Sequence, residues 1–217
     1  ALAELKEMVN SYHKAGIEVI VDVVFNHTAE AGFGGPILSY KGLCPYEAYL
    51  LEQTDAGEVF YSNHSGCGNT INTAQPFMMG LILDAMRHWV NVIGVDGFRF
   101  DLAVSLGREP QHFNSQSGLL RAISADPVLS DKVLLAEPWD IGPGGYQVGN
   151  FESPWLEVND KYRDTVRAFW RGDDGQTPDF ATRLMGSRDI FHKGHRHISS
   201  SVNNITYHDG FTLHDMV

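Results

Sequence analysis

The sequence alternates helical stripes with short apolar runs, and glycine tends to separate one from the next. A stripe over residues 2–12 ends near Gly16, and the β-branched run 18–25 that follows predicts a buried strand. The same order then recurs along the chain. Further helices are expected at 77–92, 118–125 and 159–170, and further strands at 95–101, 132–137, 155–158 and 203–207.

Strands that alternate with helices predict parallel βα units and therefore an α/β fold. Such units fit either a doubly wound sheet or part of a (β/α)8 barrel, and composition does not separate the two. Three longer segments, 28–74, 138–154 and 171–202, are expected to be loops. The first two directly follow the C-terminal end of a strand, which is where barrels build their active sites.

Composition excludes several classes of partner. The net charge of -11 disfavours nucleic acid and anionic membranes, because both require a basic surface. No apolar run approaches the ~20 residues of a membrane span. No glycine-rich phosphate loop lies between a strand and a helix, which argues against a doubly wound nucleotide-binding protein. The two cysteines are too few for a disulfide framework, and reduced thiols are expected.

Polar side chains with chemical potential follow several of the expected strands. Period-two alternation puts Arg99 and Asp101 on the same side of their strand. Because the C-terminal ends of parallel strands meet at one rim, we expect three carboxylates, one arginine and two histidines to line one pocket. The residues at these strand ends are Asn26, His27, Arg99, Asp101, Glu137, His208 and Asp209.

Such a set suits glycoside cleavage. A retaining glycosidase needs a carboxylate nucleophile and a carboxylic acid ~5–5.5 Å apart. Arg99 would keep the Asp101 carboxylate ionised and oriented. Glu137 would stay protonated, because its apolar neighbours at 138–139 would raise its pKa. Asp209 could then stabilise positive charge on the sugar ring.

Four segments together resemble the signature regions of the α-amylase superfamily, glycoside hydrolase family 13. They occur in the family's order, on the third, fourth, fifth and seventh strands of its barrel. Other stretches resemble its isoamylase and glycogen-debranching branch more narrowly. The four signature segments are 22–27, 97–101, 136–139 and 208–209, and the branch-specific stretches are 35–39, 65–70, 139–149 and 209–213.

The resemblance implies cleavage of α-glucans through a covalent glucosyl–enzyme intermediate. It makes Asp101 the nucleophile, Glu137 the general acid/base and Asp209 the transition-state stabiliser. His27, Arg99 and His208 match residues that bind the glucose next to the cut. These residues also have structural alternatives: Asp101 could cap a turn, Glu137 could be an acid at the start of a loop, and Arg99 could form a buried ion pair. His27 and His208 could be polar residues at strand ends.

Two further residues are assigned to substrate binding, with open alternatives. Trp139 and the nearby Tyr146 either stack on sugar rings or anchor their loop by packing. Asn69 resembles a substrate-loop residue, and a role in a turn is equally compatible with its position.

No metal or other cofactor is predicted. Asn26 matches a position that ligates calcium in many amylases, but the other ligands of that site are not recognisable. His192, His195 and His197 lack cysteine or acidic partners at ligand spacing, so we interpret them as part of a solvated loop.

The resemblance further implies that residues 1–217 form an incomplete catalytic barrel containing about strands three to seven. The remaining strands and the flanking β domains are not recognisable, so the isolated chain is expected to be inactive. We expect debranching of α-1,6 linkages in glycogen, limit dextrin or amylopectin. The alternatives are an endo-α-1,4 amylase, a pullulanase or a catalytically silent glucan-binding scaffold. We expect a cytoplasmic protein, or a plastid protein in a plant, without nucleic-acid or membrane partners.

Overall fold

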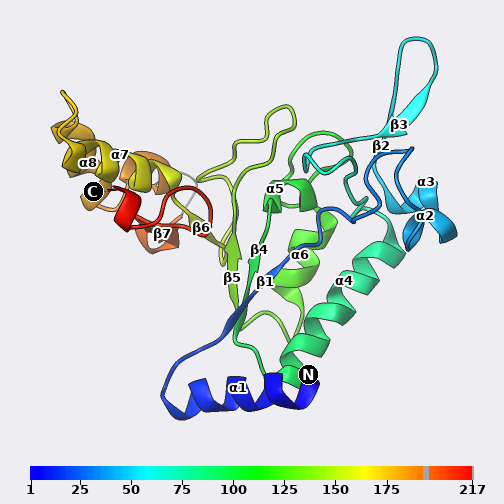
Figure 1. Ribbon diagram of the computed structural model, residues 1–217, viewed down its shortest axis with the longest axis horizontal. Helices are drawn as coiled ribbons and strands as arrows, with labels where there is room; N and C mark the ends of the chain where they lie inside the picture. Colours follow the sequence, from blue (N-terminus) through cyan, green and yellow to red (C-terminus); the bar gives the residue numbers. More distant parts are fainter. Residues whose placement is uncertain (193–195, 217) are drawn as a thin grey trace. The chain divides into compact units, whose positions relative to one another are not determined.

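The computed structural model describes residues 1–192 and 196–216. The chain forms two compact units, Ala1–Gln147 and Val148–Val217, and each is described by itself. Both combine helices with parallel strands, so the predicted α/β class is confirmed (Figure 1).

The first unit is organised around parallel strands β1 (Ile20–Val23), β4 (Gly97–Phe100) and β5 (Val133–Ala136). Strand β4 lies between the other two, and Figure 1 shows all three running in the same direction. The register places Asp22 of β1 beside Arg99 of β4. The residues that follow these strands therefore emerge at one end of the sheet.

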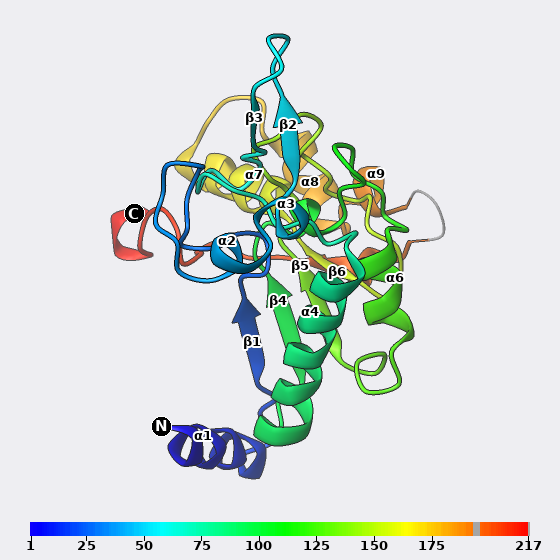
Figure 2. The same ribbon diagram turned by 90° about the vertical axis from the view of Figure 1, so that its right-hand side faces the viewer.

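Helix α1 (Leu2–Lys14) precedes β1, and α4 (Pro76–His88) precedes β4. Helix α4 continues as a π-helical turn, η1 (Trp89–Ile93), which ends at Gly94 in the left-handed conformation, as its sequence predicts. The short α5 (Ala103–Leu106) follows β4. Helix α6 (Gly118–Ala125) precedes β5, and Figures 1 and 2 show α4 and α6 on the same side of the strands.

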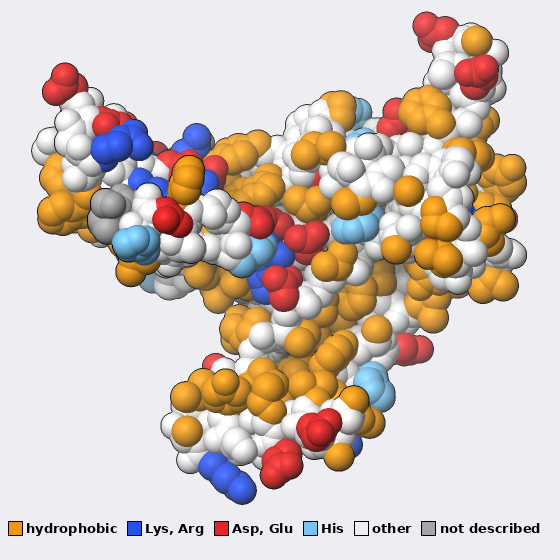
Figure 3. All heavy atoms as spheres, viewed as in Figure 1, with side chains coloured by type: hydrophobic (Ala, Val, Ile, Leu, Met, Phe, Trp, Pro, Cys, Tyr) orange, Lys and Arg blue, Asp and Glu red, His pale blue; other side chains and the backbone are white. Residues whose placement is uncertain are grey.

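Strand β4 is buried along its whole length, whereas β1 is not. Phe98 and Phe100 have no exposed surface, and their ring centroids lie 6.1 Å apart. In β1 only Val23 is buried, while Ile20 is 44% exposed. The prediction of a buried strand at 18–25 is therefore wrong for most of that run. The reason is that β1 pairs with β4 alone among the strands described. Helix α1 likewise carries exposed hydrophobic side chains, visible at the bottom of Figure 3.

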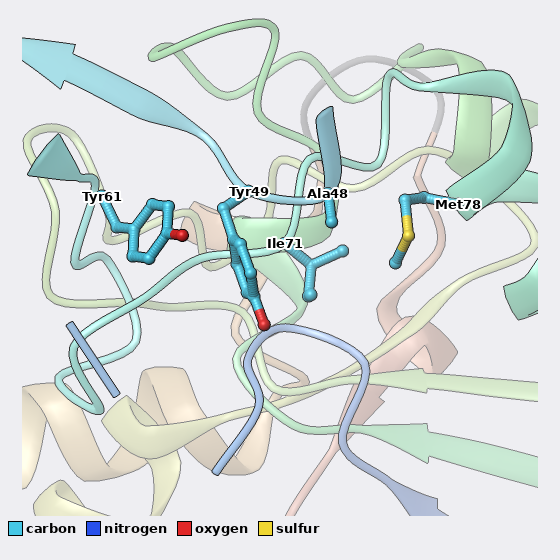
Figure 4. Close-up of a cluster of buried hydrophobic side chains, with 5 residues drawn as sticks. All are labelled: Ala48, Tyr49, Tyr61, Ile71 and Met78. Atoms are coloured by element: carbon cyan, nitrogen blue, oxygen red, sulfur yellow. The ribbon is translucent and has the colours of Figure 1, made fainter. Parts of the chain in front are cut away.

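The segment 28–74 was expected to be a loop, and this is wrong. It contains the short helices α2 (Tyr40–Leu43) and α3 (Pro45–Ala48) and an antiparallel hairpin of β2 (Leu51–Gln53) and β3 (Val59–Tyr61). These elements order because the segment builds a small hydrophobic core against helix α4. Figure 4 shows that core, which consists of Ala48, Tyr49, Tyr61, Ile71 and Met78.

The second unit contains β6 (Leu156–Val158), which pairs in parallel with β7 (Ser201–Val202). The helix expected after β6 is α7 (Asp160–Arg171), and the Asn159 side chain caps it by accepting a hydrogen bond from the Tyr162 N–H at 3.0 Å. The remaining elements are α8 (Thr177–Leu184), α9 (Arg188–Phe191) and the 3-10 turns η2 (Ile198–Ser200) and η3 (His214–Met216). The segment 171–202 is thus largely helical rather than a loop.

The strand predicted at 203–207 is misplaced, because β7 ends at Val202. The Asn203 side chain accepts a hydrogen bond from the Ser201 hydroxyl at 2.7 Å, and the Asn204 amide donates to the Thr206 carbonyl at 3.3 Å. Local bonds of this kind compete with a strand ladder. As a consequence, the residues 208–209 do not directly follow a strand.

A buried ion pair organises the start of the second unit. Glu157 of β6 is fully buried, and its carboxylate accepts hydrogen bonds from the backbone N–H groups of Gly149 (2.5 Å) and Phe151 (3.3 Å). The Arg196 guanidinium lies 2.7 Å from the same carboxylate. Burial raises the pKa of Glu157 to about 7, although Arg196 opposes that change.

Within residues 1–192 and 196–216, none of the helices has the length and apolar character that a membrane span requires.

Candidate active site

Arg99 connects the ends of the three parallel strands β1, β4 and β5 of the first unit. Its Nη1 lies 3.0 Å from a carboxylate oxygen of Asp22 and 3.0 Å from one of Asp101, and its Nη2 lies 3.0 Å from Glu137. The arginine side chain is only 10% exposed. One buried guanidinium thus faces three carboxylates, one from each strand or strand end. The predicted convergence of Arg99, Asp101 and Glu137 is present.

Asn26 orients Asp101. It follows β1, is fully buried, and its side-chain N–H group donates to the Asp101 carboxylate at 2.8 Å and to the Asp101 carbonyl at 2.7 Å. The Asp101 side chain keeps 24% of its surface exposed. The carboxylate is therefore fixed in direction by Asn26 and Arg99 and still open to a reactant. The sequence alone related Asn26 only to calcium.

Glu137 lies in a different environment, with only 6% of its side chain exposed. Its Oε2 accepts a hydrogen bond from the Leu102 N–H at 2.9 Å. Burial is the main reason why the pKa of Glu137 is raised above its ordinary value. The charge of Asp101 and a hydrogen bond to that carboxyl group act in the same direction, whereas the Leu102 N–H and Arg99 act against it. Glu137 therefore favours its protonated form, as a general acid requires.

His27 lies at the same strand end, half-buried. Its Nδ1 is in contact with the side-chain oxygen of Asn26, which in turn holds Asp101. This places the imidazole at the edge of the carboxylate cluster.

Asn69 lies close by, but both ends of its amide bind backbone. Its oxygen accepts from the Thr28 N–H at 2.9 Å, and its nitrogen donates to the carbonyls of Thr28 and Ala31, each at 3.0 Å. The side chain is fully buried. These contacts favour the turn role over direct contact with substrate. Asn69 holds the loop that begins directly after His27.

The same loop is closed by Glu30, a residue that the sequence analysis did not single out. Its carboxylate is buried and accepts the backbone N–H groups of Leu38 (2.7 Å), Ser39 (2.7 Å) and Lys41 (3.1 Å). It also accepts the hydroxyl of Tyr49, which Figure 4 shows pointing out of the hydrophobic cluster toward this loop. Burial alone would raise the pKa of Glu30, but these hydrogen bonds lower it to about 2.

Lys41 completes this closure from the other side. Its ammonium group donates to the carbonyl oxygens of Glu30 (3.0 Å), Gly32 (2.5 Å), Phe33 (3.3 Å) and Gly35 (3.0 Å). A cation therefore fills a ring of carbonyls inside the loop. Nothing in the sequence pattern distinguishes Lys41 from a solvated surface lysine.

The loop after β5 brings Trp139 and Tyr146 together in an isolated β-bridge. Trp139 is half-buried, and Tyr146 is 48% exposed. Both alternatives for these rings, sugar stacking and packing, remain compatible with that exposure.

His208 and Asp209 belong to the second unit, where both side chains are exposed. The His208 Nε2 lies 3.4 Å from the Asp209 carboxylate, and its ring contacts Tyr207 at a centroid distance of 4.3 Å. Among the predicted site residues, the structure thus brings together Arg99, Asp101 and Glu137, with His27 joined to them through Asn26. This cluster is defined without His208 and Asp209.

No group of three or more His, Cys, Asp or Glu side chains within residues 1–192 and 196–216 is arranged to hold a metal ion. The side chain of Asn26, which the resemblance relates to calcium, is occupied by Asp101 and His27. Of the histidines considered for a metal, His195 lies outside the described residues.

Comparison with curated proteins gives whole-chain matches. A protein from Mycobacterium tuberculosis named "Glycogen operon protein GlgX homolog" is 49% identical over 217 residues, which is 100% of this chain and 30% of that protein. A "Glycogen debranching enzyme" from Erwinia tasmaniensis is 49% identical over 214 residues, covering 99% of this chain and 32% of that enzyme. No protein-family model matches the sequence.

The solved structures agree with these relatives. A pullulanase from an Anoxybacillus species, complexed with maltotriose, matches 99% of this chain with a TM-score of 0.76 and 27% identity. A pullulanase from Bacillus acidopullulyticus matches 98% with a TM-score of 0.74 and 30% identity.

These whole-chain relatives and structures confirm the predicted resemblance to the α-amylase superfamily. Within that superfamily, the names of the relatives agree with the predicted isoamylase and glycogen-debranching branch. The predicted partial (β/α)8 barrel is confirmed by the same comparisons together with the parallel strands. The chain spans about a third of the length of the curated relatives that it matches.

Proposed function

We propose that this chain supplies the catalytic acids of a retaining hydrolase that cleaves α-1,6 branch linkages in glycogen or limit dextrin. One observation supports the chemistry: the guanidinium of a single buried arginine, Arg99, lies 3.0 Å from the carboxyl groups of both Asp101 and Glu137. Burial raises the pKa of Glu137 and so favours its protonated form. The choice of bond is supported by the relatives that are named glycogen debranching enzymes.

The two carboxyl groups have different roles because their surroundings differ. Protonated Glu137 donates its proton to the glycosidic oxygen while Asp101 attacks the anomeric carbon. The carbon–oxygen bond to the leaving chain breaks, and an ester between Asp101 and the sugar forms. Glu137, now ionised, removes a proton from water, which attacks the same carbon, breaks the ester and releases a sugar of retained configuration.

The close approach of these groups supports retention over inversion. Asp101 and Glu137 each lie 3.0 Å from the same Arg99 guanidinium, one on each terminal nitrogen. Inverting enzymes separate their two carboxyl groups by ~6.5–9.5 Å to admit a water molecule. Arg99 and Asn26 fix the nucleophile in direction, so little reorganisation is needed when the sugar arrives.

The remaining site residues complete the proposal. Asp209 would stabilise the positive charge that develops on the sugar, and His27 and His208 would bind its hydroxyl groups, together with Arg99. Trp139 would stack against a neighbouring glucose. We assign no step to a metal ion or other cofactor. The partner is an α-glucan.

We also propose that residues 1–217 supply strands three to seven of the catalytic barrel. The remaining strands and flanking β domains would lie elsewhere in a longer polypeptide. The length of the relatives, of which this chain covers 30–32%, supports this proposal. Activity is therefore measured on the protein expressed from the complete open reading frame.

The test compares three substrates. Incubation with glycogen or a limit dextrin is expected to release short linear chains, with amylose left intact. Rapid loss of iodine staining from amylose would instead identify an endo-α-1,4 amylase. Preferential conversion of pullulan to maltotriose would identify a pullulanase. The solved pullulanase structures favour this alternative at 27–30% identity, but the glycogen debranching enzymes are more similar to the chain, at 49% identity.

A glucan-binding scaffold is distinguished by one substitution. Asp101→Asn preserves shape and removes the nucleophile, so turnover should fall by at least ~10³-fold while maltotriose binding persists. A wild-type protein that binds glycogen but releases no sugar would favour the scaffold. Equal turnover in the variant would remove Asp101 from the mechanism.

A further inference from the structure

A second buried ion pair lies beside the carboxylate cluster of the first unit. Arg108 and Asp140 have fully buried side chains, and they meet through two parallel hydrogen bonds. The Arg108 Nη2 lies 2.6 Å from Asp140 Oδ1, and its Nε lies 2.8 Å from Oδ2. This fork-to-fork contact fixes direction as well as distance.

The pair joins the two segments that carry the proposed catalytic acids. Asp140 lies three positions after Glu137, and Arg108 lies seven positions after Asp101, just beyond α5. Two shorter ties reinforce the connection. The Ser105 hydroxyl of α5 donates to Asp140 at 3.0 Å, and the N–H at residue 103 donates to the Glu137 carbonyl at 3.0 Å.

Asp140 also folds the loop that follows Glu137. Its carboxylate accepts the Gly142 N–H at 2.9 Å, and its own N–H donates to the Gly145 carbonyl at 3.0 Å. Arg108 donates to the Pro143 carbonyl at 3.1 Å. This is the loop that bears both aromatic candidates for sugar stacking.

The packing around the pair leaves little freedom. A Cβ atom added at Gly142 would come within 2.3 Å of the His64 Nδ1 and 2.7 Å of the Arg108 Nη2. The Nε2 atom of His64 lies 2.9 Å from the side-chain oxygen of Gln111. The backbone carbonyl of Gln111 accepts a hydrogen bond from Arg108. The pair is therefore held on several sides.

Stability alone is a poor explanation for such a pair. Removing both charges from water costs free energy that their attraction often only balances, and a well-packed apolar pair of similar volume is often as stable. What an apolar pair lacks is the directional lock between two segments. That lock lies where the separation between two carboxyl groups decides the chemistry.

We propose that Arg108 and Asp140 are positioning residues that set the separation of Asp101 and Glu137 and keep water away from Glu137. This inference rests on the function proposed above. Neither residue touches the proposed reacting atoms. Each acts through the backbone segment that it shares with a catalytic acid.

The proposal has a consequence for the pH dependence of activity. Glu137 is faced by Arg99 and Asp101 and by the Leu102 N–H, with Asp22 behind Arg99. Burial is the main contribution that raises the pKa of Glu137. If the lock is released, water reaches this carboxyl group, and its pKa falls toward the ordinary value.

The test uses the double variant Arg108→Met/Asp140→Leu in the protein from the complete open reading frame. Single substitutions would leave an uncompensated buried charge and risk loss of folding, whereas the double variant removes both charges. We expect a folded protein that binds maltotriose, with kcat at least tenfold lower. We also expect the alkaline limb of kcat/KM against pH to move to lower pH, which a smaller folded fraction would not cause.

Arg108→Lys provides a second route, because it keeps the charge and loses the fork. It should show the same displacement of the alkaline limb. The matched control is the double variant Arg87→Met/Asp126→Asn, which removes both charges of another ion pair in the same unit, whose Arg87 Nη2 lies 2.6 Å from Asp126. This control should lower stability and leave the limb in place.

The outcomes separate this inference from the proposed function. A wild-type protein that cleaves no glucan overturns both. An active wild type with double and Lys variants that retain its kcat and its alkaline limb overturns the positioning role alone. A limb that moves equally in the Arg87→Met/Asp126→Asn control also overturns it.

Discussion

Glu30 offers the clearest quantitative prediction. Its pKa is lowered from an ordinary 4.5 to about 2 by the groups that donate to it. At ~1.36 kcal/mol for each tenfold change in the proton equilibrium, this amounts to ~3 kcal/mol in favour of the folded loop at neutral pH. Glu30→Gln removes that contribution. The glutamine side chain also turns an N–H₂ group toward backbone N–H donors, which it cannot bind. The loss of stability should therefore be at least as large as the contribution of the Glu30 carboxylate.

The sign follows from the direction of the change. Because the folded pKa lies below the unfolded one, the stabilisation is complete above about pH 4.5 and is lost as the pH falls toward 2. Hydrogen exchange at pH 7 measures it locally. The amides of Leu38, Ser39 and Lys41, which donate to this carboxylate, should exchange on the order of 100-fold faster in the variant.

Glu47→Gln is the matched control, since it removes the same charge from an exposed position on α3 in the same segment. It should leave the exchange of those amides within about threefold of the wild type. Unchanged protection at Ser39 in the Glu30 variant would refute the reasoning that these hydrogen bonds hold the loop. Equal acceleration in both variants would do the same.

Three other changes test the carboxylate cluster. Glu137→Gln removes the general acid, so kcat should fall by ~10²–10⁴-fold. Because the raised pKa of Glu137 means that the folded state disfavours its ionised form, the variant should be at least as stable as the wild type in urea at pH 7. This difference in stability should fade below pH 4.5, where Glu137 is protonated in both the folded and the unfolded state. Asn26→Ala leaves an oxygen of Asp101 without its donor, which should cost ~1–3 kcal/mol in unfolding experiments and lower kcat more than it raises KM. Dialysis against EDTA should leave glycogen debranching unchanged, because Asn26 is occupied by its neighbours; a loss of activity that calcium restores would contradict this.

Local pattern predicted the central part of the fold and of the site. All of Gly97–Phe100 in β4 is buried, and its phenylalanines alternate with Arg99 and the following Asp101. That alternation placed the two polar side chains together, and Glu137 followed the apolar strand β5. The raised pKa of Glu137 also follows from its neighbourhood, because burial is the dominant cause.

Long-range contacts explain what local pattern could not predict. Glu30 gains its role only when Tyr49 and the backbone around Ser39 fold onto it. Arg108 is unremarkable in sequence until Asp140, 32 positions later, meets it in the interior. The strand β7 was misplaced because the apolar run around Ile205 suggested pairing, whereas asparagine side chains redirect the backbone there.

The central claim is that Asp101 forms a covalent bond with the sugar. A fluorinated glucosyl fluoride, which slows the second step, should trap the ester on the protein from the complete open reading frame. Peptide mass spectrometry should then locate the added sugar on Asp101 and nowhere else, with none in the Asp101→Asn variant. An active enzyme that carries the label on another residue, or that acquires none while its product shows inverted configuration, would contradict the account.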